Sequence, residues 1–120
     1  MNSATATRIA ATAGLLAVAL GAFGAHGLKD LLANNGTAAI WEKAVFYHFI
    51  HAVMLFLLAE RKVFPAVAWW FFLAGIIIFS GSLYLLAVTD LKWLGAITPL
   101  GGLSFMVGWL GLALGWGKKV

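Results

Sequence analysis

Residues 41–59 form the apolar run WEKAVFYHFIHAVMLFLLA, which carries three polar ring side chains, Tyr47, His48 and His51. At about 100° per residue in a helix, His51 lies about 40° around the helix from Tyr47, and His48 lies about 100° from it. Polar groups are costly in hydrocarbon, so we expect this arc of a membrane-spanning helix to face protein instead of lipid.

The composition of the whole chain is that of a membrane protein. Of its 120 residues, 63% are hydrophobic and 10% are charged, against a usual charged share of about 25%. We therefore predict a single integral membrane domain over residues 1–120. The net charge of +4 is spread in single cations and pairs at the ends of apolar runs, which does not suggest a nucleic-acid partner. The chain has no cysteine, which excludes disulfides and thiolate sites.

Four apolar stretches alternate with polar connections, and each is near the ~20 residues that cross a bilayer. We predict an all-α, antiparallel bundle of four transmembrane helices, near residues 9–26, 40–59, 66–88 and 99–116. The first run follows a single Arg8 and lacks a good cleavage context, so we expect a retained helix instead of a signal peptide. The segment LKDLLANNG over residues 28–36 has leucines on one face and charges opposite, which predicts a short interfacial helix. Thr37 is a plausible N-cap for the second spanning helix.

The basic residues predict the orientation in the membrane. One side carries the larger group of cations: Arg8, Arg61, Lys62, Lys118 and Lys119. The other side carries Lys29, Lys43 and Lys92, each close to an acidic residue. Cytoplasmic loops are enriched in Lys and Arg, so we expect a multi-pass protein of the inner (plasma) membrane with both termini cytoplasmic. Tryptophans should mark the two interfaces: Trp41 and Trp93 at one, and Trp69, Trp70 and Trp116 at the other. Trp109 lies inside the fourth run.

Small residues recur at steps of three and four along the first and fourth spanning segments. The first stripe is Ala10, Gly14, Ala17, Gly21 and Gly24; the second is Gly101, Ser104, Gly108, Gly111 and Gly115. Close backbone packing drives helix association in lipid, so we expect the two stripes to face each other. The predicted packing glycines are Gly14, Gly21, Gly24, Gly108, Gly111 and Gly115. Two alternatives are that glycine is simply frequent in membrane helices, and that one stripe contacts another protomer.

Polar side chains collect toward the non-cytoplasmic half of the predicted bundle. The candidate ligand-binding residues are His26, Tyr47, His48, His51, Ser80, Ser82 and Tyr84. One hypothesis is that they hydrogen-bond one another and hold the helices in register. The other is that they bind a lipid, a quinone or an ion. Three histidines without a thiolate or a nearby carboxylate on the helix are a weak metal signature, so we predict neither a metal site nor a cofactor.

Several longer motifs resemble the YgdD/YwdK family of small bacterial membrane proteins. They are GAFGAHGL at residues 21–28, the spacing Trp41-x-x-Ala44-x-x-Tyr47-x-x-x-His51, FSGSLYLLA at residues 79–87, and TPLGG followed by Gly108-Trp109. This resemblance covers nearly the whole chain and implies a four-helix inner-membrane protein of unknown function. His48 lies outside the shared pattern, so we expect it to be the incidental histidine.

The function that these observations favour is that of a non-enzymatic accessory or interaction component. Its partners would be the lipid bilayer and either another membrane protein or a second copy of the chain. The alternative is a small unit that binds or transports a ligand through the polar group around His51. The sequence contains no motif for nucleophilic catalysis, and an enzyme is the least favoured class.

Overall fold

The structure is a computed structural model, and it describes residues 1–116. Its elements in chain order are the helices α1 (Ser3–Ala25), α2 (Lys29–Asn35), α3 (Ala38–Ala59) and α4 (Ala66–Gly75), the π-helix η1 (Ile76–Ser80), the helix α5 (Gly81–Thr89), the 3₁₀ helix η2 (Lys92–Ala96) and the helix α6 (Thr98–Ala113). Helices α4 and α5 are joined through η1 into one continuous span.

Four helical segments are long and apolar enough to cross a membrane, namely Ser3–Ala25, Ala38–Ala59, Ala66–Thr89 and Lys92–Ala113. This confirms the predicted fold class. The first helix begins earlier than expected because the Asn2 side chain caps it, accepting a hydrogen bond of 2.8 Å from the Thr5 N–H. The last helix ends earlier because Gly115 adopts a left-handed conformation, with φ of 72°. The fourth span was predicted to reach residue 116, whereas α6 ends at Ala113. The cations Lys118 and Lys119 belong to residues 117–120, which lie outside the described range.

The connections between spans are short. Helix α2 follows α1 and ends at Gly36, which has φ of 68° as a left-handed C-cap. Thr37 precedes α3, but its side chain does not cap that helix. Instead the buried Thr37 hydroxyl donates a 2.7 Å hydrogen bond to the Ala87 carbonyl on α5. Thr37, which was expected to cap α3, therefore connects the start of α3 to α5.

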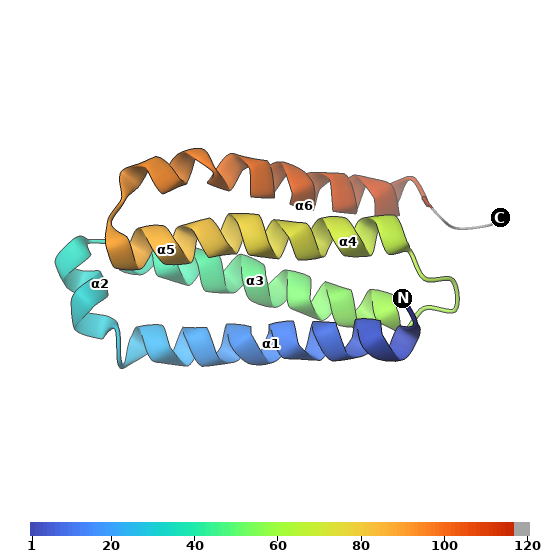
Figure 1. Ribbon diagram of the computed structural model, residues 1–120, viewed down its shortest axis with the longest axis horizontal. Helices are drawn as coiled ribbons and strands as arrows, with labels where there is room; N and C mark the ends of the chain where they lie inside the picture. The colour runs from blue at the N-terminus through green and yellow to red at the C-terminus, as the bar shows by residue number, and fades with distance from the viewer. Residues whose placement is uncertain (117–120) are drawn as a thin grey trace.

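The spanning helices are arranged so that α1 packs along α3, α3 packs along α4, η1 and α5, and α6 packs along α4 and η1. Figure 1 shows α1 at one side of the bundle and α6 at the opposite side. The N-terminus and the α3–α4 connection lie at one end, and α2 lies at the other. The prediction that the two small-residue stripes face each other is therefore wrong.

The small residues serve other contacts. A Cβ built at Gly108 would lie 2.6 Å from Cδ1 of Phe72, and one built at Gly21 would lie 3.2 Å from Cγ1 of Val45. Gly24 in the same way makes room for the indole of Trp41. Each stripe thus receives large side chains from the nearest helix, and this explains why the stripes need not meet.

Not every stripe residue packs against another helix. A Cβ at Gly14 would meet no atom within 4 Å. One at Gly111 would contact the ring of Trp116, which follows the same helix. Gly115 lies after α6 and supplies its left-handed turn. The geometry of Gly14 and Gly115 therefore does not fit the predicted role in packing between helices, and the nearest contact at Gly111 is with Trp116.

Two of the tryptophans expected at the membrane interfaces lie in the protein interior. Trp69 is fully buried, and its Nε1 donates a 3.1 Å hydrogen bond to the Leu55 carbonyl of α3. Trp41 is 5% exposed and donates from Nε1 to the Leu20 carbonyl of α1 at 2.9 Å. Trp70 and Trp93 are exposed, as residues of an aromatic belt would be. The interior pair instead fastens α3 to its two neighbours.

Candidate functional site

The centre of the candidate site is the imidazole of His51, in the middle of α3. Its Nδ1 lies 2.7 Å from the Tyr47 carbonyl one turn earlier, and its Nε2 lies 3.0 Å from Nε1 of Trp109 on α6. An indole N–H can only donate, so Nε2 of His51 must accept. The hydrogen of the neutral ring is then on Nδ1, which donates to the Tyr47 carbonyl. Both ring nitrogens of His51 are therefore engaged.

Aromatic packing fixes the plane of the same imidazole. The His51 ring stacks on Phe105 with ring centroids 3.7 Å apart and an angle of 11° between the planes. The rings of Phe72 and Trp109 approach it edge-on, with centroids at 5.2 Å and 5.9 Å. Only 3% of His51 is exposed. The group is thus a packed contact between α3, α4 and α6, and it contains no open coordination position.

His48 is not incidental, contrary to the sequence-based expectation. It is buried, and its Nδ1 lies 2.8 Å from the hydroxyl of Tyr84 on α5. Either group can donate in this hydrogen bond. Tyr84 also packs on Trp41, with ring centroids 4.8 Å apart. The His48–Tyr84 pair therefore connects α3 to α5 at a place separate from the His51–Trp109 pair.

The two serines make further bridges between spans. Ser80, in η1, donates a 2.7 Å hydrogen bond to the Ala44 carbonyl of α3. Ser82 lies 2.7 Å from the hydroxyl of Thr98 at the start of α6, and it also donates to the Phe79 carbonyl at 3.0 Å. Ser80 and Ser82 thus bond to different helices and do not share a ligand position.

Of the remaining two candidates, His26 lies apart from these bridges, whereas Tyr47 lies beside His51. His26 follows α1, is exposed, and bonds through Nδ1 to the Ala22 carbonyl of its own helix at 2.8 Å. The Tyr47 side chain is 37% exposed and packs on Phe79 with ring centroids 4.8 Å apart. Tyr47 contributes its backbone carbonyl to His51. Apart from His26, which bonds within its own helix, the candidates take part in several separate contacts between helices instead of one cluster.

Sequence reasoning missed the residues that complete these contacts. Trp109 was set apart as a tryptophan inside the fourth run, and nothing in the sequence connects it to His51, which is 58 positions away. Asn35 and Ser104 were also missed; they donate to the carbonyls of Ala87 and Phe71, at 3.1 Å and 2.7 Å. A recurring pattern emerges, in which a polar side chain of one span bonds to a backbone carbonyl of another.

The hydrogen bonds of the buried polar groups limit the chemistry that the interior can perform. Within residues 1–116, every buried side-chain nitrogen or oxygen has a hydrogen-bond partner. The same part of the chain contains no group of three His, Cys, Asp or Glu side chains placed to hold a metal. A polar group that is already paired in hydrocarbon stabilises helix contacts, because the alternative is an unpaired group in lipid.

Four apolar helices joined by buried polar bridges define a small multi-pass integral membrane protein. The chain belongs to the family described as "Protein of unknown function (DUF423)", whose model matches residues 20–102. It is 47% identical over 102 residues to the "UPF0382 membrane protein YwdK" of Bacillus subtilis, covering 80% of this chain and 82% of that protein. It is 44% identical over 104 residues to a "UPF0382 membrane protein" of Staphylococcus epidermidis, covering 83% and 84%. No solved structure gives a significant match. The resemblance inferred from the motifs is thus confirmed.

Proposed function

We propose that this protein acts in the membrane as a non-enzymatic accessory or interaction component, and that it contacts its partner through its outer surface. The observation that carries the proposal is the pairing of His51, whose two nitrogens are taken by the Tyr47 carbonyl and the Trp109 indole. A proton or a ligand taken up at Nε2 would displace the Trp109 indole, which can only donate a hydrogen bond. His51 instead acts as a strut between α3 and α6.

Nothing in the geometry favours the alternative, in which the polar group around His51 binds or transports a small ligand. A ligand would have to displace Trp109 or the Tyr47 carbonyl from His51. It would also have to open the stack of His51 on Phe105. We propose no cofactor for this protein.

The proposal is tested by separating interior from surface substitutions. A photocrosslinking residue at Leu103 on the outer face of α6, or at Leu15 on α1, projects outward because these side chains are 54% and 69% exposed. We expect one of the two faces, and not both, to crosslink to a membrane protein or to a second copy of the chain in native membranes. Crosslinks to lipid alone from both faces would contradict the proposal.

A second arm tests the strut role directly in cells. His51→Gln should preserve the crosslink, since glutamine offers both a donor and an acceptor. If His51→Gln abolished the biological activity of a protein that still folds and still crosslinks, the ligand-binding alternative would gain and the proposal would fail.

We further propose that both termini are cytoplasmic and that the membrane is the inner (plasma) membrane. Arg8 lies near the start of α1, and Arg61 and Lys62 lie in the α3–α4 connection. These two segments are at the same end of the bundle, and Lys and Arg are enriched on the cytoplasmic side. The chain lacks cysteine, so a single introduced cysteine is the only thiol that can react. Asn34 and Val63 are exposed, at the α2 end and in the α3–α4 connection. Asn34→Cys should react with an impermeant maleimide in intact cells, and Val63→Cys only after permeabilisation. The opposite result would invert the orientation.

A further inference from the structure

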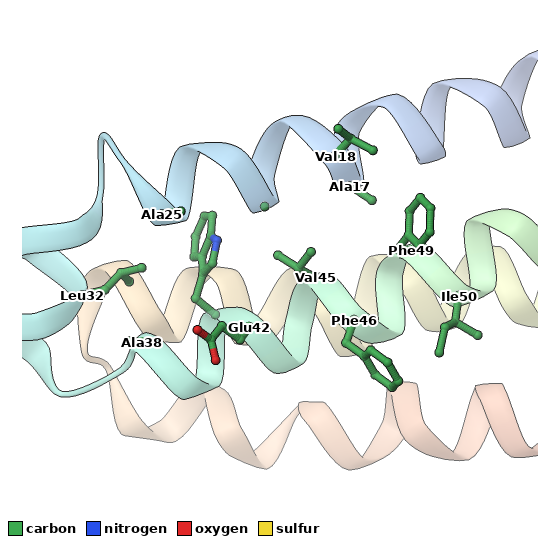
Figure 2. Close-up of a pocket in the computed structure, with 13 residues that line it drawn as sticks. Ala17, Val18, Ala25, Leu32, Ala38, Glu42, Val45, Phe46, Phe49 and Ile50 are labelled. Carbon is green, nitrogen blue, oxygen red and sulfur yellow. The ribbon is translucent and has the colours of Figure 1, made fainter.

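A groove runs between α1 and α3 on the outside of the bundle, and we name it the α1–α3 groove (Figure 2). Its walls include Ala17, Gly21 and Ala25 from α1 and Glu42, Val45 and Phe49 from α3. It holds about 550 Å³, within the ~300–1,000 Å³ typical of small-molecule sites. The lining is almost wholly apolar, and Glu42 is its charged residue. The groove exists because small residues of α1 lie opposite large ones of α3.

The length of the α1–α3 groove fits one leaflet of a bilayer. On α1 it extends from Ala17 to Ala25, and on α3 from Ala38 to Ile50. At 1.5 Å per residue these are about 12 Å and about 18 Å, close to half of the ~30 Å hydrocarbon core. Nearer the N-terminus, buried alanines of α1 pack directly into the core. A transmembrane helix of a partner would need a groove along the whole span, whereas the chain of one lipid needs only this half.

The charged end of the α1–α3 groove favours a cation. Figure 2 shows Glu42 at the end of the groove marked by Ala25, Leu32 and Ala38. Within the described residues the one salt bridge joins Lys92 to Asp90, so the Glu42 carboxylate has no ion-pair partner. Helix α1 also ends here, and its last turn contains no basic residue. The C-terminal end of a helix carries partial negative charge, which adds to that of the carboxylate.

We propose that the α1–α3 groove binds one phospholipid with a primary ammonium headgroup, such as phosphatidylethanolamine. An acyl chain lies along Gly21, Val45 and Phe49, and the ammonium lies between the Glu42 carboxylate and the C-terminal end of α1. The ammonium has three N–H donors, which match a carboxylate and the partial negative charge at the C-terminal end of α1. A trimethylated headgroup has no N–H donor and would bind more weakly.

The test compares lipids that differ only in the headgroup. The full-length protein in detergent is incubated with phosphatidylethanolamine or phosphatidylcholine of identical acyl chains, and retained lipid is counted by native mass spectrometry. We expect the wild type to prefer phosphatidylethanolamine by about two- to five-fold, the range of an exposed ion pair. Glu42→Gln should remove the preference and leave retention of the chain intact. Asp30→Asn, a nearby exposed carboxylate outside the groove, should keep the preference.

A second pair of variants tests the place where the chain lies. Ala25→Leu adds bulk to an exposed groove residue and should lower retention of both lipids, whereas Ala22→Leu, exposed but not lining the groove, should not. Equal retention of both lipids by the wild type, or a preference that survives Glu42→Gln, would overturn the proposal. A dimer that Ala25→Leu dissociates would also overturn it, because the groove would then hold a second copy of the chain. Melting temperatures of all variants verify that each is folded.

Discussion

At Gly101, α6 lies directly against the backbone of the third span, and Gly101→Ala tests that contact. A Cβ at Gly101 would lie 2.6 Å from both Cα and Cβ of Phe79, and closer still to its backbone nitrogen. The obstacle is backbone in the π-helix η1, not the free end of a side chain. Relief would require α6 and η1 to separate, which would also disturb the bond between Ser82 and Thr98.

The neighbouring Gly102 supplies a control. A Cβ there would lie 3.7 Å from Cδ1 of Phe79, which is ordinary van der Waals contact. Both substitutions gain the same helix preference of alanine over glycine, about 1 kcal/mol. Only Gly101→Ala adds the cost of overpacking, about 1–3 kcal/mol. We therefore expect Gly101→Ala to be less stable than Gly102→Ala by about 1–3 kcal/mol, since the shared preference cancels.

The assay is equilibrium unfolding in mixed micelles with increasing sodium dodecyl sulfate, followed by tryptophan fluorescence. The wild type and both variants are measured in the same detergent at the same protein concentration. Equal free energies of unfolding for Gly101→Ala and Gly102→Ala would refute the reasoning, because they would show that α6 does not lie against the backbone of Phe79.

Three further predictions use the same unfolding assay, together with a melting temperature where metals are added. His51→Gln should retain more stability than His51→Leu, since leucine leaves the Trp109 N–H and the Tyr47 carbonyl without their partner. Membrane hydrogen bonds of this kind average ~0.6 kcal/mol, which sets the size of the expected difference. A larger loss of stability for glutamine than for leucine would contradict the strut role. In a double-mutant cycle, His51→Leu and Trp109→Phe should couple by about 0.6 kcal/mol, and zinc or copper should not raise the melting temperature; a metal-dependent rise lost in His51→Leu would show a metal site instead. Gly21→Leu and Gly108→Leu should each destabilise the bundle, with effects additive to within about 0.5 kcal/mol, because they lie in the separate α1–α3 and α4–α6 contacts; a sub-additive double variant would place them in one interface.

The sequence by itself determined the class of fold, because the length of an apolar run sets whether it can cross hydrocarbon. The four runs, the short helix over Lys29–Asn35 and the break at Gly36 all follow from local composition and turn chemistry. The polar character of the interior was also readable, since the buried His48 and His51 lie on one arc of α3. These features depend on residues that are close together in the chain.

Only the tertiary structure decided which helices are neighbours. A stripe of small residues indicates that something approaches closely, but it does not identify the approaching group. Gly108 receives Phe72 and Gly24 receives Trp41, so the two stripes pack on different helices. The hydrogen bond between His51 and Trp109 likewise depends on the rotation of two helices about their own axes, and no local pattern encodes that rotation.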